Sequence, residues 1–161
     1  MHLRQESPSI SSNGYDFEGS NGSYQYRREE DVYVLIDNAN SKDWVARATA
    51  FEQINEFISD IKPQEHLSNN LMDQLIQTHI QHINDHHYKV VVACQESFSR
   101  LITIYNSRVL TYLDQIIPQL FINLTEGKEK VSASTNFLIN LINKIYSGNW
   151  ILEILLLICN L

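Results

Sequence analysis

Apolar residues recur every three or four positions along most of the chain, which is the period of a helix with one buried face. No segment alternates apolar and polar residues as a half-buried strand does. Pro63 closes the second helical run, and Pro118 lies inside the fifth, where its missing N–H predicts a kink. The pattern predicts an all-α protein with helical runs near 32–36, 48–58, 67–83, 90–102, 110–124 and 131–145.

Short polar loops interrupt this pattern three times at a nearly constant interval. Anchored on Asp43, Asp85 and Glu126, the loops are 42 and then 41 residues apart. A period of this size with a helix on either side is typical of HEAT-type helical hairpins. Stacked hairpins place such loops along one edge, so the sequence predicts an α-solenoid with a binding surface there. The three loops are Ser41–Trp44, Asp85–Lys89 and Glu126–Lys130.

The two ends of the chain differ from this regular part. Residues 1–28 are rich in Ser, Gly, Asn and Tyr and are expected to be a disordered tail. Glu29, Glu30 and Asp31 are then interpreted as first-turn acidic residues of the first helix. The apolar run 150–161 is shorter than the roughly 20 residues of a membrane span. It is interpreted as the first helix of a fourth hairpin, so the domain predicted over 29–161 holds about three and a half repeats and is C-terminally incomplete.

Composition and charge argue against several classes of function and location. The net charge of −7 disfavours non-specific nucleic-acid binding, which needs a basic surface. Cys94 and Cys159 both fall in apolar helical patterns, so a disulfide framework is improbable and a reducing, cytosolic setting fits. The N-terminal residues lack the apolar stretch of a secretory signal, and no membrane association is expected.

No arrangement of residues points to catalysis. The five glycines form no phosphate-binding loop and no Ser or Cys lies in a nucleophile motif, so neither an enzyme nor a cofactor is expected. His79, His82, His86 and His87 raise the question of a metal site, since the first three share one helical face. Zinc needs three or four ligands held tetrahedrally, and no Cys or carboxylate cluster completes this set. The histidines are therefore interpreted as solvated or capping residues.

Three segments resemble the tubulin-binding TOG domain, a HEAT-repeat family, in its CLASP and crescerin groups. Lys42–Ala50 is similar to the family's Asp-Trp-x-x-Arg-x-x-Ala opening loop, and Asp85–Val90 to its Asp-x-Asn-x-Lys-Val second loop. Leu113–Phe121 followed by Gly127–Val131 resembles the third repeat, with its Ile-x-Pro-x-Leu pattern and lysine-containing loop. The resemblance covers roughly 31–146.

This resemblance implies binding of αβ-tubulin or microtubules through the inter-helix loops, and hence a regulator of microtubule dynamics. The residues carried over by position are Trp44 as aromatic anchor and Lys89, Lys128 and Lys130 as electrostatic contacts, with Lys42 and Arg47 as further candidates. An exposed tryptophan is a frequent interface hot spot, and surrounding lysines would speed encounter with an acidic partner. The implied location is the cytoplasm and its cytoskeleton, with spindle and cilium both open.

Two alternatives stay open on the sequence. Trp44 can instead hold two helices of one hairpin together, and the loop lysines can be ordinary solvated charges. The whole chain can instead be a HEAT-repeat scaffold that binds a protein other than tubulin through a helical face.

Overall fold

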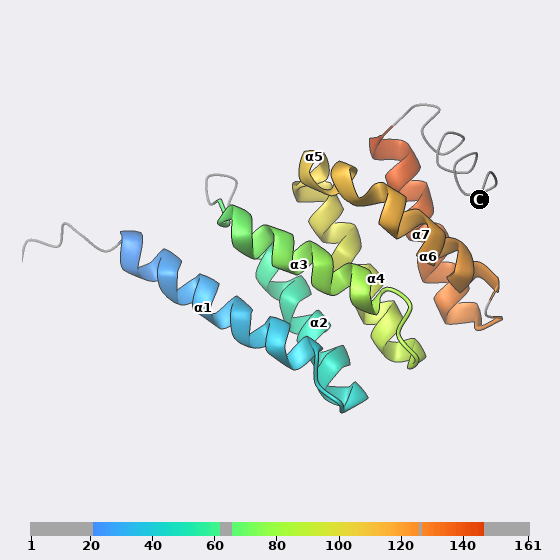
Figure 1. Cartoon of the computed structure of the whole chain (residues 1–161), viewed down its shortest axis with the longest axis horizontal. Helices are drawn as coiled ribbons and strands as arrows, with labels where there is room; N and C mark the ends of the chain where they lie inside the picture. Colours follow the sequence, from blue (N-terminus) through green and yellow to red (C-terminus); the bar gives the residue numbers. More distant parts are fainter. Residues whose placement is uncertain (1–20, 62–65, 126, 147–161) are drawn as a thin grey trace, which may run out of the picture.

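The chain is an all-α helical repeat in a computed structural model that describes residues 21–61, 66–125 and 127–146 (Figure 1). Within these ranges there is no strand, and no helix has an apolar stretch long enough to cross a membrane. The fold class predicted from the hydrophobic period is thereby confirmed. The helices are α1 (Asn21–Ala39), α2 (Trp44–Ser59), α3 (Asn69–His82), α4 (Tyr88–Ile104), α5 (Asn106–Val109), the 3-10 turn η1 (Leu110–Tyr112), α6 (Leu113–Thr125) and α7 (Glu129–Ile145).

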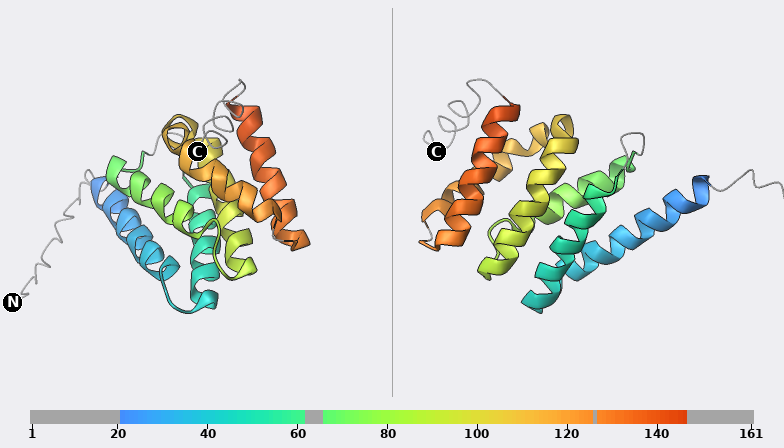
Figure 2. Two further views of the ribbon diagram at one scale, coloured as in Figure 1. Left: turned by 45° about the vertical axis from the view of Figure 1, so that its right-hand side comes forward. Right: turned by 180° about the vertical axis from the view of Figure 1, so that it is seen from behind.

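The helices form three stacked hairpins in two rows. Within each hairpin α1 packs on α2, α3 on α4, and α6 on α7, while α2 packs on α4 and α4 on α7 between hairpins. The row formed by α2, α4 and α7 is seen side by side from behind in Figure 2, with α1, α3 and α6 forming the other row. This stacking brings the three polar loops to one edge, the lower edge in Figure 1, as the repeat spacing predicted.

The loops end and restart helices through local chemistry. Asp43 is the N-cap of α2, and its Oδ1 accepts a hydrogen bond from the Val45 amide at 3.0 Å. Ser68 caps α3 in the same way, with Oγ 3.4 Å from the Leu71 amide. Gly127 has φ +70°, a conformation that favours glycine, and lies just before α7. Of the three polar loops, the first thus supplies a side-chain cap, whereas the N-cap residues His87 of α4 and Lys128 of α7 make no side-chain cap hydrogen bond.

A continuous apolar core lies between the two rows. Its largest fully buried side chains come from every hairpin and include Phe51, Ile54, Leu75, Phe98, Leu101, Ile116 and Leu120. Side chains about 40 residues apart also join adjacent hairpins by hydrogen bonds. One example is the buried pair Gln95 and Thr135, whose Nε2 and Oγ1 are 3.0 Å apart. The sequence separation of these contacts is thus close to the length of one repeat.

Three sequence expectations need correction or fall outside the described residues. Helix α1 begins at Asn21, eight residues before the predicted boundary, because Gln25 and the Arg27–Glu30 run favour helix. The interpretation of Glu29, Glu30 and Asp31 as first-turn residues is therefore wrong. Glu29 lies within α1 and its carboxylate accepts from the Ser68 amide at 2.8 Å. Residues 1–20 of the predicted tail and the predicted fourth-hairpin helix at 150–161 lie outside the described residues.

The fifth predicted helix is divided. Residues 106–125 form α5, η1 and α6 in succession, so the run expected from residue 110 begins as a 3-10 turn before α6 starts at Leu113. Pro118 lies within α6, which continues past it to Thr125.

Candidate functional site

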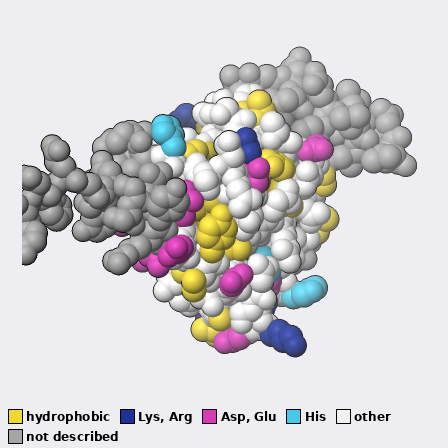
Figure 3. Space-filling model, turned by 60° about the vertical axis from the view of Figure 1, so that its left-hand side comes forward, with side chains coloured by type: hydrophobic (Ala, Val, Ile, Leu, Met, Phe, Trp, Pro, Cys, Tyr) yellow, Lys and Arg dark blue, Asp and Glu magenta, His cyan; other side chains and the backbone are white. Residues whose placement is uncertain are grey.

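The edge formed by the three loops is where the N-termini of α2, α4 and α7 meet (Figures 1 and 2). Each helix carries a partial positive charge at its N-terminus, and the three N-termini all point to this strip of surface. We call this strip the loop edge and define it by Lys42, Trp44, His87, Tyr88, Lys89, Lys128 and Lys130. The lower tip of the molecule in Figure 3, at the first loop, carries a basic side chain beside an acidic one.

Trp44 is half-buried at this edge and contacts the second loop. Its ring stacks on His87 with a centroid separation of 3.8 Å and an interplanar angle of 16°. Lys89 places Nζ 5.2 Å from the centroid of the Trp44 ring, within the range of a cation–π contact. Trp44 therefore joins the first two hairpins and still presents part of its indole to solvent. Both interpretations of this residue, as a staple and as a contact surface, have a geometric basis.

The contact series continues to the third loop. His87 stacks on Tyr88 with centroids 5.4 Å apart, and Lys128 places Nζ 5.7 Å from the Tyr88 ring centroid. These contacts link Lys89, Trp44, His87, Tyr88 and Lys128 in one series. Cations and aromatic rings from three hairpins thus form one connected surface.

Two further residues predicted for the site, Lys130 and Lys42, are exposed near these contacts. Lys130 is exposed in the first turn of α7 and lines the same surface hollow as Trp44 and Lys89. Lys42 is exposed in the first loop. Four of the six predicted residues, Trp44, Lys89, Lys128 and Lys130, are therefore brought together by contacts or a shared hollow.

Arg47 has an internal role. Its Nε and Nη2 donate to the two carboxylate oxygens of Asp85, each at 2.9 Å, and its Nη1 donates to the carbonyls of Ser41 and Lys42. The two side chains are only 13% and 6% exposed. The structure therefore makes Arg47 a cross-link between the first and second hairpins, and a direct partner contact for it stays a prediction.

Asp85 is the centre of this cross-link. It also accepts from the His87 amide at 2.9 Å and lies 3.1 Å from His82 Nδ1, while His82 Nε2 lies 3.1 Å from Asn40 Oδ1. Burial alone would raise the pKa of Asp85, but the hydrogen bonds from Arg47, His87 and His82 outweigh it and leave the pKa lowered. A charged carboxylate thus holds the first two loops in register.

The histidines considered as metal ligands are used for packing. His79 Nδ1 lies 2.7 Å from the Leu75 carbonyl, and Nε2 lies 2.9 Å from Ser97 Oγ. Burial, as the largest cause, lowers the pKa of His79 to about 4, so the ring is neutral at pH 7. In the described part of the chain no group of three His, Cys, Asp or Glu side chains is arranged to hold a metal ion.

Sequence reasoning missed His87 and Tyr88 as parts of the site. His87 was interpreted as solvated or capping, whereas its ring lies between Trp44 and Tyr88 and its side chain makes no cap hydrogen bond. The repeat spacing could have indicated this contact, because it places the second loop beside the first. Aromatic rings in consecutive loops are then candidates for stacking.

The fold and this edge define a class: an all-α, HEAT-like helical repeat with aromatic and basic side chains on its loop edge. Among curated proteins, a CLIP-associated protein from Arabidopsis thaliana is 25% identical over 124 residues, covering 76% of this chain. The chain spans 9% of that relative's length. No protein-family model and no solved structure matches the chain. The similarity supports a relation to CLIP-associated proteins, the CLASP group that the sequence motifs resemble.

Proposed function

We propose that this chain is a TOG-like module that binds αβ-tubulin or microtubules through its loop edge and acts in regulating microtubule dynamics. The observation that carries the proposal is the half-exposed Trp44 with Lys89 above its ring and Lys130 in the same hollow. The similarity to a CLIP-associated protein supports the same class of function. A cytoskeletal location follows from the proposal.

The tryptophan and the lysines should contribute differently to the free energy of binding. A partly desolvated tryptophan at the centre of an interface costs about 2 kcal/mol or more when removed, as hot-spot residues do. Exposed lysines contribute about 0–1 kcal/mol each and mainly speed the encounter with an acidic surface. Trp44 should therefore dominate affinity, while Lys89, Lys128 and Lys130 should govern its dependence on salt.

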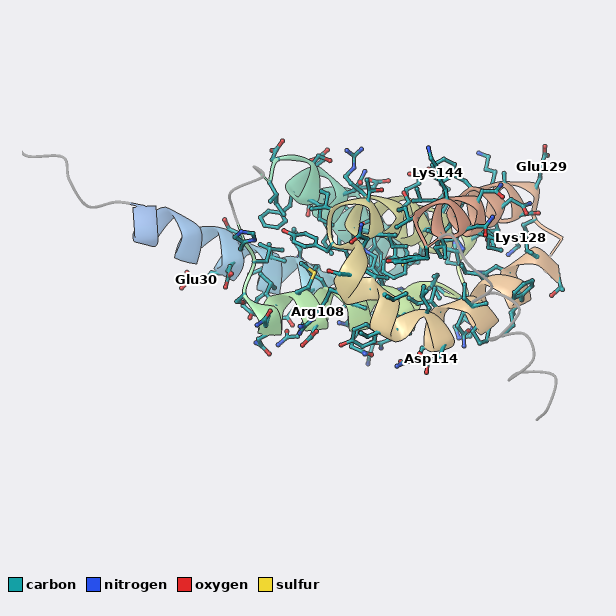
Figure 4. The ribbon with its side chains drawn as sticks, turned by 90° about the horizontal axis from the view of Figure 1, so that it is seen from above. Glu30, Arg108, Asp114, Lys128, Glu129 and Lys144 are labelled. Atoms are coloured by element: carbon teal, nitrogen blue, oxygen red, sulfur yellow. The ribbon has the colours of Figure 1, made fainter. Side chains whose placement is uncertain are left out.

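The direct test is gel-filtration co-elution of the chain with αβ-tubulin. Trp44→Glu should abolish co-elution, and Lys130→Glu should weaken it. Lys144→Glu is the matched control, since Lys144 is also exposed on α7 but lies in its last turn, apart from Lys128 and Glu129 (Figure 4). Raising the salt concentration should weaken binding of the wild-type chain.

Because Trp44 also packs on the core, its variant needs a check of folding by circular dichroism. Lys130 is exposed, so Lys130→Glu tests the edge without that complication. Absence of tubulin binding by the wild-type chain, or equal loss in Lys130→Glu and Lys144→Glu, would count against the proposal.

A further inference from the structure

The surface hollow that Trp44 shares with Lys89 and Lys130 extends from the loop edge onto the row of helices seen side by side from behind in Figure 2. We call it the α2–α4 hollow. Trp44 and Tyr88, the first residues of α2 and α4, line the end that lies at the loop edge. Its volume is about 360 Å³, near the lower end of the roughly 300–1,000 Å³ of ligand pockets. The hollow therefore suits one large side chain rather than a whole peptide.

The middle of the hollow is apolar. Ala48 and Ala93, both buried, face it from α2 and α4, and such small side chains leave space between the two helices. Val45 and Val92 also line it, and Val45 is 48% exposed. Apolar surface beside the half-buried Trp44 can be covered by an apolar side chain of a partner, and interface hot spots are typically such filled pockets.

The charged groups of the hollow are separated along the helix axes. Lys89 and Lys130 are the second residues of α4 and α7 and therefore lie at the loop edge. Glu52 and Glu96 are each the ninth residue of their helix, about 10 Å further from that edge at 1.5 Å per residue. Within the described residues neither lysine forms an ion pair with a glutamate. The hollow thus has a cationic end, an apolar middle and an acidic far end.

The separation of these charges decides what the hollow can accept. About 10 Å exceeds the Debye length of about 8 Å in physiological salt, so the far carboxylates only weakly oppose an anion at the lysines. The N-terminal ends of the helices add partial positive charge at the same end. An acidic group of a partner is therefore favoured at the loop edge and disfavoured at the far end of the hollow.

We propose that the α2–α4 hollow receives one apolar side chain from the acidic surface that binds the loop edge. The inference rests on the proposed function and adds a determinant of its specificity. An aspartate or glutamate of the partner meets Lys89 and Lys130, and the apolar side chain beside it lies in the middle of the hollow against Trp44. A second carboxylate at the far end would face Glu52 and Glu96, so the hollow also fixes the direction of the bound segment.

The test is to fill the hollow. Thr49 lines it from an exposed position on α2, so Thr49→Trp places a large ring there, while Val45→Ala removes apolar surface without adding charge. In titrations of fluorescently labelled αβ-tubulin, Thr49→Trp should bind about tenfold or more weakly and Val45→Ala about threefold more weakly. The loss in Thr49→Trp should persist at high salt, whereas the loss in Lys130→Glu should shrink. Circular dichroism should show an unchanged fold, because both substituted positions are exposed.

Matched controls separate the hollow from the rest of the surface. Thr103→Trp makes the same change at an exposed threonine near the other end of α4 that does not line the hollow. Val34→Ala makes the same change as Val45→Ala at an exposed valine of α1. Both controls should bind αβ-tubulin as the wild type does. Glu96→Gln should bind equally or slightly more tightly, because the far end holds no cation of the partner.

The outcomes distinguish this inference from the proposed function. If Lys130→Glu weakens tubulin binding but Thr49→Trp does not, the loop edge binds tubulin and the hollow receives no side chain. If the wild-type chain does not bind αβ-tubulin, the proposed function and this inference both fail. Clearly weaker binding by Glu96→Gln would also overturn the inference, since the far end would then hold a cation.

Discussion

Consecutive hairpins use the same repeat position in different ways. Arg47, Lys89 and Lys130 are equivalent in the repeat, since they are 42 and 41 residues apart. At the first junction Arg47 is nearly buried and bonds both oxygens of Asp85. Lys89, the equivalent residue of the second hairpin, is exposed and lies over Trp44 of the first hairpin. The second junction, between the second and third hairpins, has hydrogen bonds between uncharged groups. These include Asn123 Nδ2 to the Ile83 carbonyl at 2.7 Å.

The difference follows from the chemistry of the two cations. A guanidinium has a planar set of donors that can satisfy a carboxylate and two backbone carbonyls together, as Arg47 does. A lysine ammonium is a strongly hydrated point charge on a flexible stem, so it stays at the surface. The first junction therefore fixes the geometry of the loop edge, and the later repeats present charge on it.

The largest expected effect comes from breaking the first junction. Arg47→Ala leaves the buried Asp85 carboxylate without its main partner and should lower the free energy of unfolding by about 3 kcal/mol. Lys89→Ala, the change at the equivalent repeat position, should lower it by less than about 1 kcal/mol. Urea unfolding followed by circular dichroism measures both. Similar losses in the two variants would show that the two repeat positions do not differ as their geometry indicates.

Acid should weaken the same junction through His79, which lies between Phe51 of α2 and Phe98 of α4. Its pKa is lowered to about 4 by burial, against about 6.5 in an unfolded chain. The unfolded state therefore binds the proton first, and stability is lost as pH falls from about 6.5 towards 4. Between pH 7 and pH 5 this amounts to about 2 kcal/mol.

Urea unfolding of the wild type and His79→Gln at both pH values isolates this contribution. The variant should lose less stability on acidification than the wild type, whatever its stability at pH 7. Equal pH dependence of the two proteins would contradict a neutral, buried His79. Below about pH 4, protonation of Asp85, whose pKa is lowered, should remove a further contribution in both.

The sequence predicted the repeat architecture because its signals are local and periodic. Helical runs, capping residues such as Asp43 and the loop spacing all follow from short-range rules. It did not predict that Asp85 pairs with Arg47 or that His87 stacks on Trp44. Both contacts join residues about 40 positions apart, and their geometry depends on how one hairpin is rotated against the next. Helical period does not encode that rotation, so the role of Arg47 could not be separated from that of Lys89.

The second junction, between the second and third hairpins, includes a buried hydrogen-bonded pair of uncharged side chains, Gln95 and Thr135. Thr135→Val removes the partner of Gln95, which is fully buried, and should cost about 1–2 kcal/mol because an amide is left unsatisfied. The double variant Gln95→Leu, Thr135→Val should recover much of that loss, since no polar group then lacks a partner. Urea unfolding of the three proteins tests this. A double variant less stable than the single one would show that shape, not hydrogen bonding, decides packing here.

The smallest effect is expected at an ion pair away from the loop edge. Arg108 and Asp73 join α5 to α3 with an Nη2–Oδ2 distance of 2.7 Å, and the hydrogen bond from Arg108 is the main cause that lowers the pKa of Asp73. The side chains are 40% and 39% exposed, so water and salt screen their attraction. Arg108→Ala should therefore shift the urea midpoint far less than Arg47→Ala, although both pairs are bidentate. If the two variants are equally destabilised, neither burial nor the carbonyls of Ser41 and Lys42, which Arg47 also reaches, make the Arg47–Asp85 pair stronger than the exposed pair.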